Sequence, residues 1–304
     1  MRHLFIINPA AGKENRSVEL KGEIARAMQG REEPCEIYVT KGPRDATEKI
    51  LSEAERGDEL RVYACGGDGT LNECVCGAAE KPNVSVTHYP CGTGNDFIKA
   101  FGDERERFFS LQELIEGEER AIDVIRVGDR YSVNICSVGI DARIGCNVHK
   151  YSKLGGAGGY VISTVVEVVK GVSTPLRAAI DETVVEGETT LICVCNGTSY
   201  GGFFRPVPEA RVDDGALDVL VAGKVSRLTF AKLVGVYAKG GYRKMPEVIS
   251  RYTARRAVIE AEDEFSVNLD GEELRTKRAE MELVPGGLRF TFPKAMAYFK
   301  NEEE

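Results

Sequence analysis

The sequence contains no tryptophan and only three histidines in 304 residues, at positions 3, 88 and 149. Histidines this few and this scattered argue against a histidine metal centre. Long apolar runs are absent too: none approaches the roughly 18 residues that would span a bilayer. Residues 1–4 lead directly into a predicted strand and do not form a secretory signal. These absences predict a cytosolic protein.

Several familiar site patterns are also missing. There is no G-x-x-x-x-G-K-[ST] loop and no G-x-G-x-x-G loop. This excludes P-loop NTPases and the common dinucleotide and protein-kinase loops. The nine cysteines include no Cys-x-x-Cys pair, so they predict reduced thiols and not zinc ligands. A net charge of -8 argues against nucleic-acid binding, which needs a concentrated positive surface.

The most informative stretch is residues 61–73, RVYACGGDGTLNE. An apolar run typical of a strand ends in a glycine loop, and helical spacing follows. Glycines allow positive φ and close approach to a bulky anion, and the next helix N-terminus adds positive charge, so the loop is predicted to bind phosphate. Asp68 then needs a bridging divalent cation or a role as proton acceptor. The alternative is a tight turn with an exposed aspartate.

Residues 1–123 alternate between strand and helix patterns and predict an open, mostly parallel α/β sheet. Strands are expected at 4–7, 36–40, 60–65 and 84–89, with helices in the first two intervals. Glycine loops at 8–13 and 90–96 follow strands in the same way as the loop at 66–70. Because ligands of such sheets bind beyond the carboxyl ends of the strands, all three loops should converge on one site.

Close-set strand patterns replace this alternation in residues 124–293 and predict a second, mainly antiparallel β domain. Strands are expected there at 131–138, 191–195, 216–221, 256–261, 265–270 and 280–284. Helices are expected there only from about Gly159 and from Ser226. The tail, 294–304, is expected to fold back onto the first domain. Phe203 and Phe204 lie in a glycine loop flanked by prolines, and they either meet a lipid chain or bilayer or close the second core.

Four candidate residues each have a simpler structural interpretation. Lys13 follows a strand-ending turn and could neutralise a phosphate, although surface lysines are common. Thr93 lies between glycines that would admit a ligand, or it is a plain turn residue. Asp96 opens a helix and could be an N-cap. Asp270 and Gly271 form the dipeptide most typical of a type I′ hairpin turn.

Four motifs span most of the chain in a fixed order: NPAAG at 8–12, GGDGT at 66–70 with Asn72 and Glu73, GTGNDF at 92–97 and DGE at 270–272. In these motifs the chain resembles the diacylglycerol kinase catalytic-domain family, in its branch of bacterial soluble lipid kinases, related to sphingosine, ceramide and NAD kinases. GGDGT alone is shared with NAD kinases, but its combination with GTGNDF and a late DGE is specific to lipid kinases. Cys91 and Ala11 depart from the family pattern without touching a proposed catalytic group.

The resemblance implies an ATP-binding, NAD-kinase-like α/β domain, a β-sandwich domain and a cleft between them. It implies nucleotide or phosphate contacts from Asn8, Gly12, Lys13, Thr40, Gly66, Gly67, Gly69, Thr70 and Thr93. The catalytic carboxylates that it implies are Asp68, Asp96, Glu272 and Asp270. Asp68 would organise the γ-phosphate through a bridging Mg²⁺, and Glu272 or Asp270 would accept the proton of the lipid hydroxyl, with Asp68 as the next candidate.

A second, structural Mg²⁺ sits at a DDG turn in related bacterial kinases. The resemblance therefore implies a site here made by the Asp214 carboxylate and the carbonyls of Arg211 and Ala216. Oxygen-only ligation suits Mg²⁺.

The sequence thus predicts an enzyme that uses ATP and Mg²⁺ to phosphorylate the hydroxyl of a lipid such as diacylglycerol, acting from the cytosol at the membrane surface. Its expected partners are a lipid alcohol and, transiently, a membrane; nucleic acid is not expected, and a homo-oligomer is left open. One alternative is a kinase of a soluble acceptor such as NAD. The other is a nucleotide-sensing regulator without catalysis, which the intact Asp68, Asp96 and Glu272 disfavour.

Overall fold

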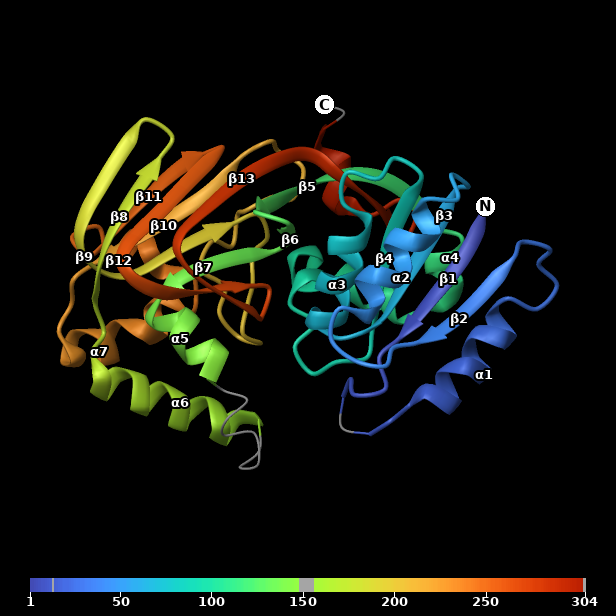
Figure 1. The fold of residues 1–304 in the computed structure, drawn as a ribbon, viewed down its shortest axis with the longest axis horizontal. Helices are drawn as coiled ribbons and strands as arrows, with labels where there is room; N and C mark the ends of the chain where they lie inside the picture. The colour runs from blue at the N-terminus through green and yellow to red at the C-terminus, as the bar shows by residue number, and fades with distance from the viewer. Residues whose placement is uncertain (13, 148–155, 303–304) are drawn as a thin grey trace. The chain divides into compact units, whose positions relative to one another are not determined.

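The chain forms two compact units in a computed structural model that describes residues 1–12, 14–147 and 156–302 (Figure 1). Unit 1 comprises Met1–Val124 and Gly286–Glu304, and unit 2 comprises Ile125–Pro285. The division after residue 124 lies one residue beyond the predicted boundary. The chain returns to unit 1 at Gly286, earlier than the predicted 294, because the return occurs inside a strand.

Unit 1 contains a parallel sheet with the strand order β2-β1-β3-β4-β13. Strands alternate with helices, so the predicted α/β class is confirmed. In chain order the elements are β1 (Arg2–Ile7), α1 (Ser17–Ala27), β2 (Cys35–Val39), α2 (Asp45–Ala54), β3 (Leu60–Gly66), α3 (Asp68–Ala78), β4 (Val84–Pro90), the 3₁₀ segment η1 (Phe97–Phe109), α4 (Leu111–Ile115), the first part of β5 (Glu118–Val127), the end of β13 (Glu272–Phe292) and η4 (Ala297–Glu302).

The central strands of unit 1 are buried along their length, as is typical of parallel strands covered on both faces. Helices α2 and α3 pack closely, since a Cβ on Gly77 would lie 2.8 Å from Ile50 Cβ. The C-terminal tail packs against this unit through aromatic rings: Phe299 lies 4.7 Å from Phe292, and Tyr298 lies 4.9 Å from Phe101, between ring centroids.

Unit 2 is built mainly of antiparallel strands, in the order β11-β10-β9-β7-β12-β13. Strand β8 pairs with both β9 and β12, and β5 pairs with β6. In chain order the elements are the end of β5, β6 (Arg130–Ser132), β7 (Ile135–Gly139), α5 (Ile140–Asn147), α6 (Gly156–Lys170), β8 (Thr174–Ile180), β9 (Thr183–Cys195), β10 (Leu217–Gly223), α7 (Arg227–Tyr237), η3 (Gly241–Lys244), β11 (Ile249–Ala254), β12 (Arg256–Leu269) and most of β13.

Helices α5, α6 and α7 gather at one end of the unit 2 strands (Figure 1). The two predicted helices are α6 and α7, and Ser226 caps α7 by accepting from the Thr229 N–H at 3.1 Å. Helix α5 was not predicted. Among the described helices, none is long and apolar enough to cross a bilayer.

Candidate active site

Three glycine loops follow β1, β3 and β4 in unit 1. Because these strands are parallel, hydrogen-bonded neighbours, their carboxyl ends lie at one edge of the sheet. Asn8 in the first loop donates its Nδ2 to Thr70 Oγ1 at 3.0 Å, and its Oδ1 accepts from the Ala10 N–H at 2.9 Å. The first loop is thereby fixed to the first turn of α3.

Close packing, and not left-handed backbone, explains the glycines of the central loop. None of Gly66, Gly67 and Gly69 has a positive φ, so that part of the prediction is wrong. A Cβ on Gly92 would instead lie 2.5 Å from Gly67 Cα, and one on Gly12 would lie 2.9 Å from a backbone carbonyl of the third loop. Larger residues would push the three loops apart.

Asp68 is the first residue of α3 and lies where the second and third loops meet. Its Oδ1 accepts from the Asp96 N–H at 2.5 Å, and its Oδ2 faces Gly94 so closely that a Cβ there would collide with it. Helix α3 has no side-chain cap, so its first N–H groups can serve a ligand. A carboxylate beside a helix N-terminus suits a phosphate bridged by a cation.

Asp96 does not act as an N-cap, which was one of its two predicted roles. Its carboxylate forms an ion pair with Lys99 at 2.6 Å, and no side-chain cap is present at the start of η1. Thr93 is exposed in the same loop. Nearby, Asn95 has a left-handed φ of 48° and donates its Nδ2 to Gly92 O at 2.9 Å. Strained backbone of this kind concentrates at ligand-binding loops.

Thr40 and Lys13 complete the predicted nucleotide residues. The Thr40 N–H donates to Ile7 O at 2.9 Å, so Thr40 lies beside the end of β1 and its loop. Lys13 lies outside the described residues, and its phosphate contact stays a prediction.

Two residues that hold this edge of the sheet were not assigned a role from the sequence. Glu73 of α3 accepts from the N–H groups of Arg44 and Ala46, at 2.9 and 3.2 Å, and so fixes the start of α2. The buried His88 of β4 donates its Nε2–H to Gly66 O at 3.1 Å, because a carbonyl can only accept. Burial lowers the pKa of His88 to about 4, so the ring is neutral. The only feature of the sequence that pointed to a role for Glu73 was its position just after GGDGT. No feature of the sequence pointed to the role of His88.

Asp270 and Gly271 form a two-residue turn between β12 and β13 in unit 2. Their φ values of 52° and 104° are left-handed, as a type I′ turn requires. Glu272 follows as an exposed residue that begins β13.

The Asp270 carboxylate anchors this turn to the chain segment between β6 and β7. It accepts from Ser132 Oγ at 2.6 Å and from the N–H groups of Val133, Asn134 and Ile135 at 2.8, 3.2 and 2.9 Å. Four donors occupy most of the lone pairs of one carboxylate. They also explain why residues 131–138, predicted as one strand, are interrupted at Val133 and Asn134.

The DDG turn before β10 carries the residues of the predicted second metal site. Asp213 pairs with Arg211 through two contacts of 3.0 Å, whereas Asp214 is exposed and accepts from the Ala216 N–H at 3.1 Å. In the described residues no group of three or more His, Cys, Asp or Glu could hold a metal ion. The oxygen donors of Asp214, Arg211 and Ala216 nevertheless suit Mg²⁺, which keeps several waters and takes few protein ligands.

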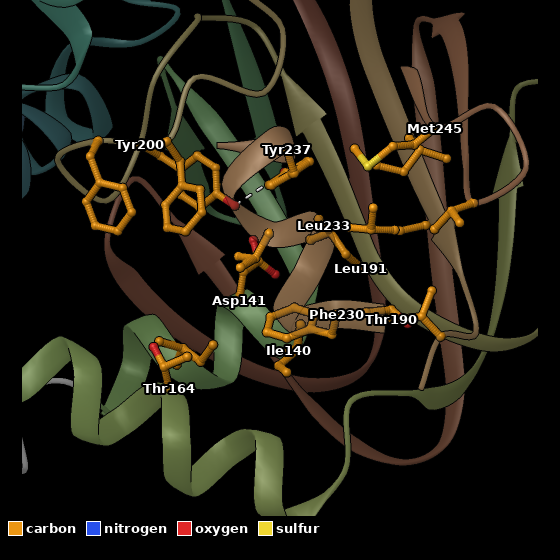
Figure 2. Close-up of a pocket in the computed structure, with 18 of the residues that line it drawn as sticks. Ile140, Asp141, Thr164, Thr190, Leu191, Tyr200, Phe230, Leu233, Tyr237 and Met245 are labelled. Carbon is orange, nitrogen blue, oxygen red and sulfur yellow. Dashed lines mark hydrogen bonds between the residues drawn. The ribbon is translucent and has the colours of Figure 1, made fainter. Parts of the chain in front are cut away.

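A cavity of about 330 Å³ opens in unit 2 between α5, α6, α7 and the strands that they cover (Figure 2). Its lining is almost entirely aliphatic and aromatic, and Asp141 is its one charged group among the described residues. The predicted aromatic pair divides here: Phe204 is buried and stacks on Tyr200, while Phe203 is 59% exposed and also lines the cavity. Each of the two predicted roles therefore applies to at most one of these rings.

Two family models match the chain, one for each part. The diacylglycerol kinase catalytic domain matches residues 2–127, and the YegS C-terminal NAD kinase beta sandwich-like domain matches residues 134–292. The second match confirms the predicted fold class of unit 2.

Known proteins resemble the chain over most of its length. Proteins named diacylglycerol kinase from Staphylococcus aureus strains RF122 / ET3-1 and MRSA252 are each 30% identical over 277 residues, covering 89% of this chain and 86% of theirs. A crystal structure from Bacillus anthracis, provisionally described as a diacylglycerol kinase, is 27% identical with a TM-score of 0.76, and the match covers 97% of this chain and 98% of that one. The motifs, the fold and these matches agree: the chain belongs to the diacylglycerol kinase catalytic-domain family, with a YegS-like C-terminal domain.

Proposed function

We propose that the protein is a lipid kinase that transfers the γ-phosphoryl group of ATP to the hydroxyl of a lipid such as diacylglycerol. The bond between the γ-phosphorus and the ADP oxygen breaks, a bond from phosphorus to the lipid oxygen forms, and the hydroxyl proton passes to a carboxylate. The products are a lipid phosphate and ADP. Such a reaction needs positioned phosphates, neutralised charge and an apolar site for the acceptor.

The observation that carries the proposal is the contact of three glycine loops around Asp68. Asn8, Thr70 and the helix N-terminus surround the same edge of the sheet, and the missing Cβ atoms of Gly67, Gly92 and Gly94 leave the backbone close to any bound phosphate. Asp68 would hold the bridging Mg²⁺, which supplies charge neutralisation when it is bound. The DDG turn would hold a structural Mg²⁺ through Asp214 and the carbonyls of Arg211 and Ala216.

Glu272 is the better candidate for proton acceptor in unit 2. Asp270 accepts four hydrogen bonds and has little capacity left for a proton, whereas Glu272 is exposed. Asp270 would then position Glu272 through the rigid turn that they share.

The acceptor and the membrane would meet unit 2 at the face formed by α6 and α7. Arg227 of α7 donates its Nε to Val168 O of α6 at 2.8 Å, so the two helices are held together. Exposed apolar side chains lie on both: Val165 and Val169 on α6 are 57% and 67% exposed, and Leu228 on α7 is 67% exposed. Val165 also lines the apolar cavity, so this face continues into it.

The charge near this face favours an anionic bilayer as its partner. The chain carries a net charge of -8, yet no acidic residue occurs between Asp218 and Glu247. Six exposed cations lie in that interval, and one of them, Arg243, forms an ion pair with Glu209: Lys224, Arg227, Lys232, Lys239, Arg243 and Lys244. Each cation near an anionic membrane surface contributes about 1 kcal/mol of attraction.

A radiolabelled ATP assay tests the proposal directly. The protein is incubated with Mg²⁺ and mixed micelles that carry diacylglycerol, monoacylglycerol, a sphingoid base or phosphatidylglycerol, and in parallel with NAD, and products are identified by mass. We expect label in a lipid product. Labelled NAD phosphate alone would replace the proposal with a soluble-acceptor kinase, and nucleotide binding without any product would favour a regulatory protein.

A further inference from the structure

Asp141 is a carboxylate in the wall of the otherwise apolar cavity. It belongs to α5 and is 8% exposed, and it lines the cavity together with apolar residues such as Ile140, Leu191 and Phe230 (Figure 2). Burying a carboxylate costs free energy unless hydrogen bonds or a partner charge compensate.

The hydrogen bonds of the Asp141 carboxylate are incomplete. Oδ1 accepts from the Ala142 N–H at 2.8 Å, whereas Oδ2 is buried and makes no hydrogen bond of normal geometry within the described residues. Burial raises the pKa of Asp141 to about 6, and the nearby hydroxyls of Ser137 and Tyr200 oppose that rise. At neutral pH the Asp141 carboxyl is therefore mostly ionised, and an ionised carboxylate can only accept hydrogen bonds.

The size of the cavity limits what can bring that donor. A methylene occupies about as much room as a water molecule, roughly 30 Å³, so 330 Å³ encloses on the order of ten methylenes. That is enough for much of one alkyl chain. Phe203 and Val165 line the cavity and are also exposed, so the cavity opens to solvent beside them.

We propose that the cavity binds one alkyl chain of the acceptor lipid and that Asp141 accepts a hydrogen bond from a second hydroxyl or amino group beside that chain. This inference rests on the proposed lipid kinase activity and narrows its substrate. Single-chain lipids that carry a second donor, such as monoacylglycerols or long-chain amino alcohols, are then preferred over diacylglycerol, whose one hydroxyl is the group that receives phosphate.

A matched pair of acceptors tests the inference. 1-O-dodecylglycerol has two hydroxyls, and 1-O-dodecyl-2-O-methylglycerol keeps only the primary one. Phosphorylation and equilibrium binding of both are measured with the wild type, with Asp141→Asn and with Asp263→Asn, which removes an exposed carboxylate of unit 2 outside the cavity lining. The melting temperature of each variant reports folding.

We expect the wild type and Asp263→Asn to prefer the diol by about 10- to 100-fold in kcat/KM, the effect of one hydrogen bond to a charged group. Asp141→Asn should lose most of that preference while its activity on the methyl ether stays within about threefold. Equal use of both lipids by the wild type, or an unchanged preference in folded Asp141→Asn, overturns the inference and leaves the lipid kinase assignment intact. If neither lipid is phosphorylated, the binding measurements decide: a diol preference that depends on Asp141 supports the cavity assignment, and its absence refutes it.

Discussion

At the scale of single residues, Asp68 should separate nucleotide binding from turnover. Asp68→Asn removes the charge that would hold the bridging cation but keeps an acceptor for the Asp96 N–H at the junction of the loops. We expect phosphorylation to fall by about 10²-fold or more, with ATP affinity within about tenfold, because the lost interaction acts mainly in the transition state. Single-turnover kinetics and calorimetric nucleotide binding measure the two quantities. Near-normal turnover in this variant would contradict the assigned role.

Asp141 should also make stability depend on pH in a direction unusual for an aspartate. Its pKa is raised to about 6 in the folded protein from a usual 3.8, so the folded state holds the proton more tightly. Its contribution to stability is therefore complete below about pH 4 and is lost as the pH rises through 6. Relative to the wild type, Asp141→Asn should gain about 2 kcal/mol of unfolding free energy between pH 4.5 and 7.5. Denaturant unfolding at both pH values measures it, and a constant difference would show that Asp141 is not buried as a carboxyl.

Some residue roles could be predicted from the sequence and others could not. Asp68 follows a strand and precedes a helix, and that local pattern fixes its place. Phe203 and Phe204 carry no such pattern, because burial in an irregular loop has no period. In the structure, Phe204 is buried and stacks on Tyr200, whereas Phe203 is exposed. His88 escapes prediction because its partner, Gly66, lies on the neighbouring strand.

At the scale of elements, two substitutions in the turn between β12 and β13 test whether Asp270 anchors the turn and Glu272 accepts the proton. Glu272→Gln keeps the shape of an exposed side chain but cannot take a proton, so kcat should fall by about 10²-fold with an unchanged melting temperature and ATP KM. Asp270→Asn keeps a good turn residue and one acceptor oxygen, but its amide NH₂ group cannot accept the hydrogen bond that the Val133 N–H donates to Oδ2. It should lower the melting temperature as well as kcat, since a buried donor loses its partner.

The opposite pattern would reverse the two roles. A thermally stable but inactive Asp270→Asn beside an active Glu272→Gln would make Asp270 the proton acceptor. Full activity in both variants would move that role to another group, with Asp68 as the next candidate.

Helices and strands were predicted correctly where the apolar pattern extended over many residues. They were missed or divided where contacts with distant parts of the chain determine the structure. The alternating strands and helices of residues 1–90 are evident from apolar runs and spacing. The segments 256–261 and 265–270 were expected to be separate strands, yet they form the single strand β12, whose pairing with β13 shifts between Glu260 and Phe265. A bulge of this kind leaves no clear mark in the sequence. Helix α5 was missed because its start directly follows β7 without a polar capping residue.

At the scale of the whole molecule, the order of motifs predicted the two units and their classes. The sequence alone could not show that β5 and β13 each run from one unit into the other, because a long strand reads the same on both sides of a boundary. Nor could it show the α6 and α7 face, because its exposed valines and leucine become a surface only when the helices pack.

That face yields the last prediction, which concerns attachment to membranes. Val165 on α6 and Val184 on β9 are similarly exposed, at 57% and 53%, so replacing either with Ser should leave the fold intact. Only Val165 lies on the proposed face. Val165→Ser combined with Leu228→Ser should weaken sedimentation with vesicles rich in phosphatidylglycerol by about fivefold or more, as expected for roughly 1 kcal/mol or more of lost apolar burial. Val184→Ser is the matched control and should bind like the wild type.

Added salt should weaken the wild-type interaction, and vesicles of neutral lipid should bind less, because the six cations between Asp218 and Glu247 contribute through charge. Phosphorylation of vesicle-borne acceptor should fall in parallel with binding, while phosphorylation of a dispersed short-chain acceptor should fall less, because Val165 is only one of the residues that line the cavity. Equal effects of the Val165/Leu228 double substitution and of Val184→Ser, or equal binding to neutral and anionic vesicles, would show that another surface meets the membrane. An equal loss on the dispersed and the vesicle-borne acceptor would instead mean that Val165 acts through the cavity, and the face and the acceptor site would then have to be treated as one apolar surface.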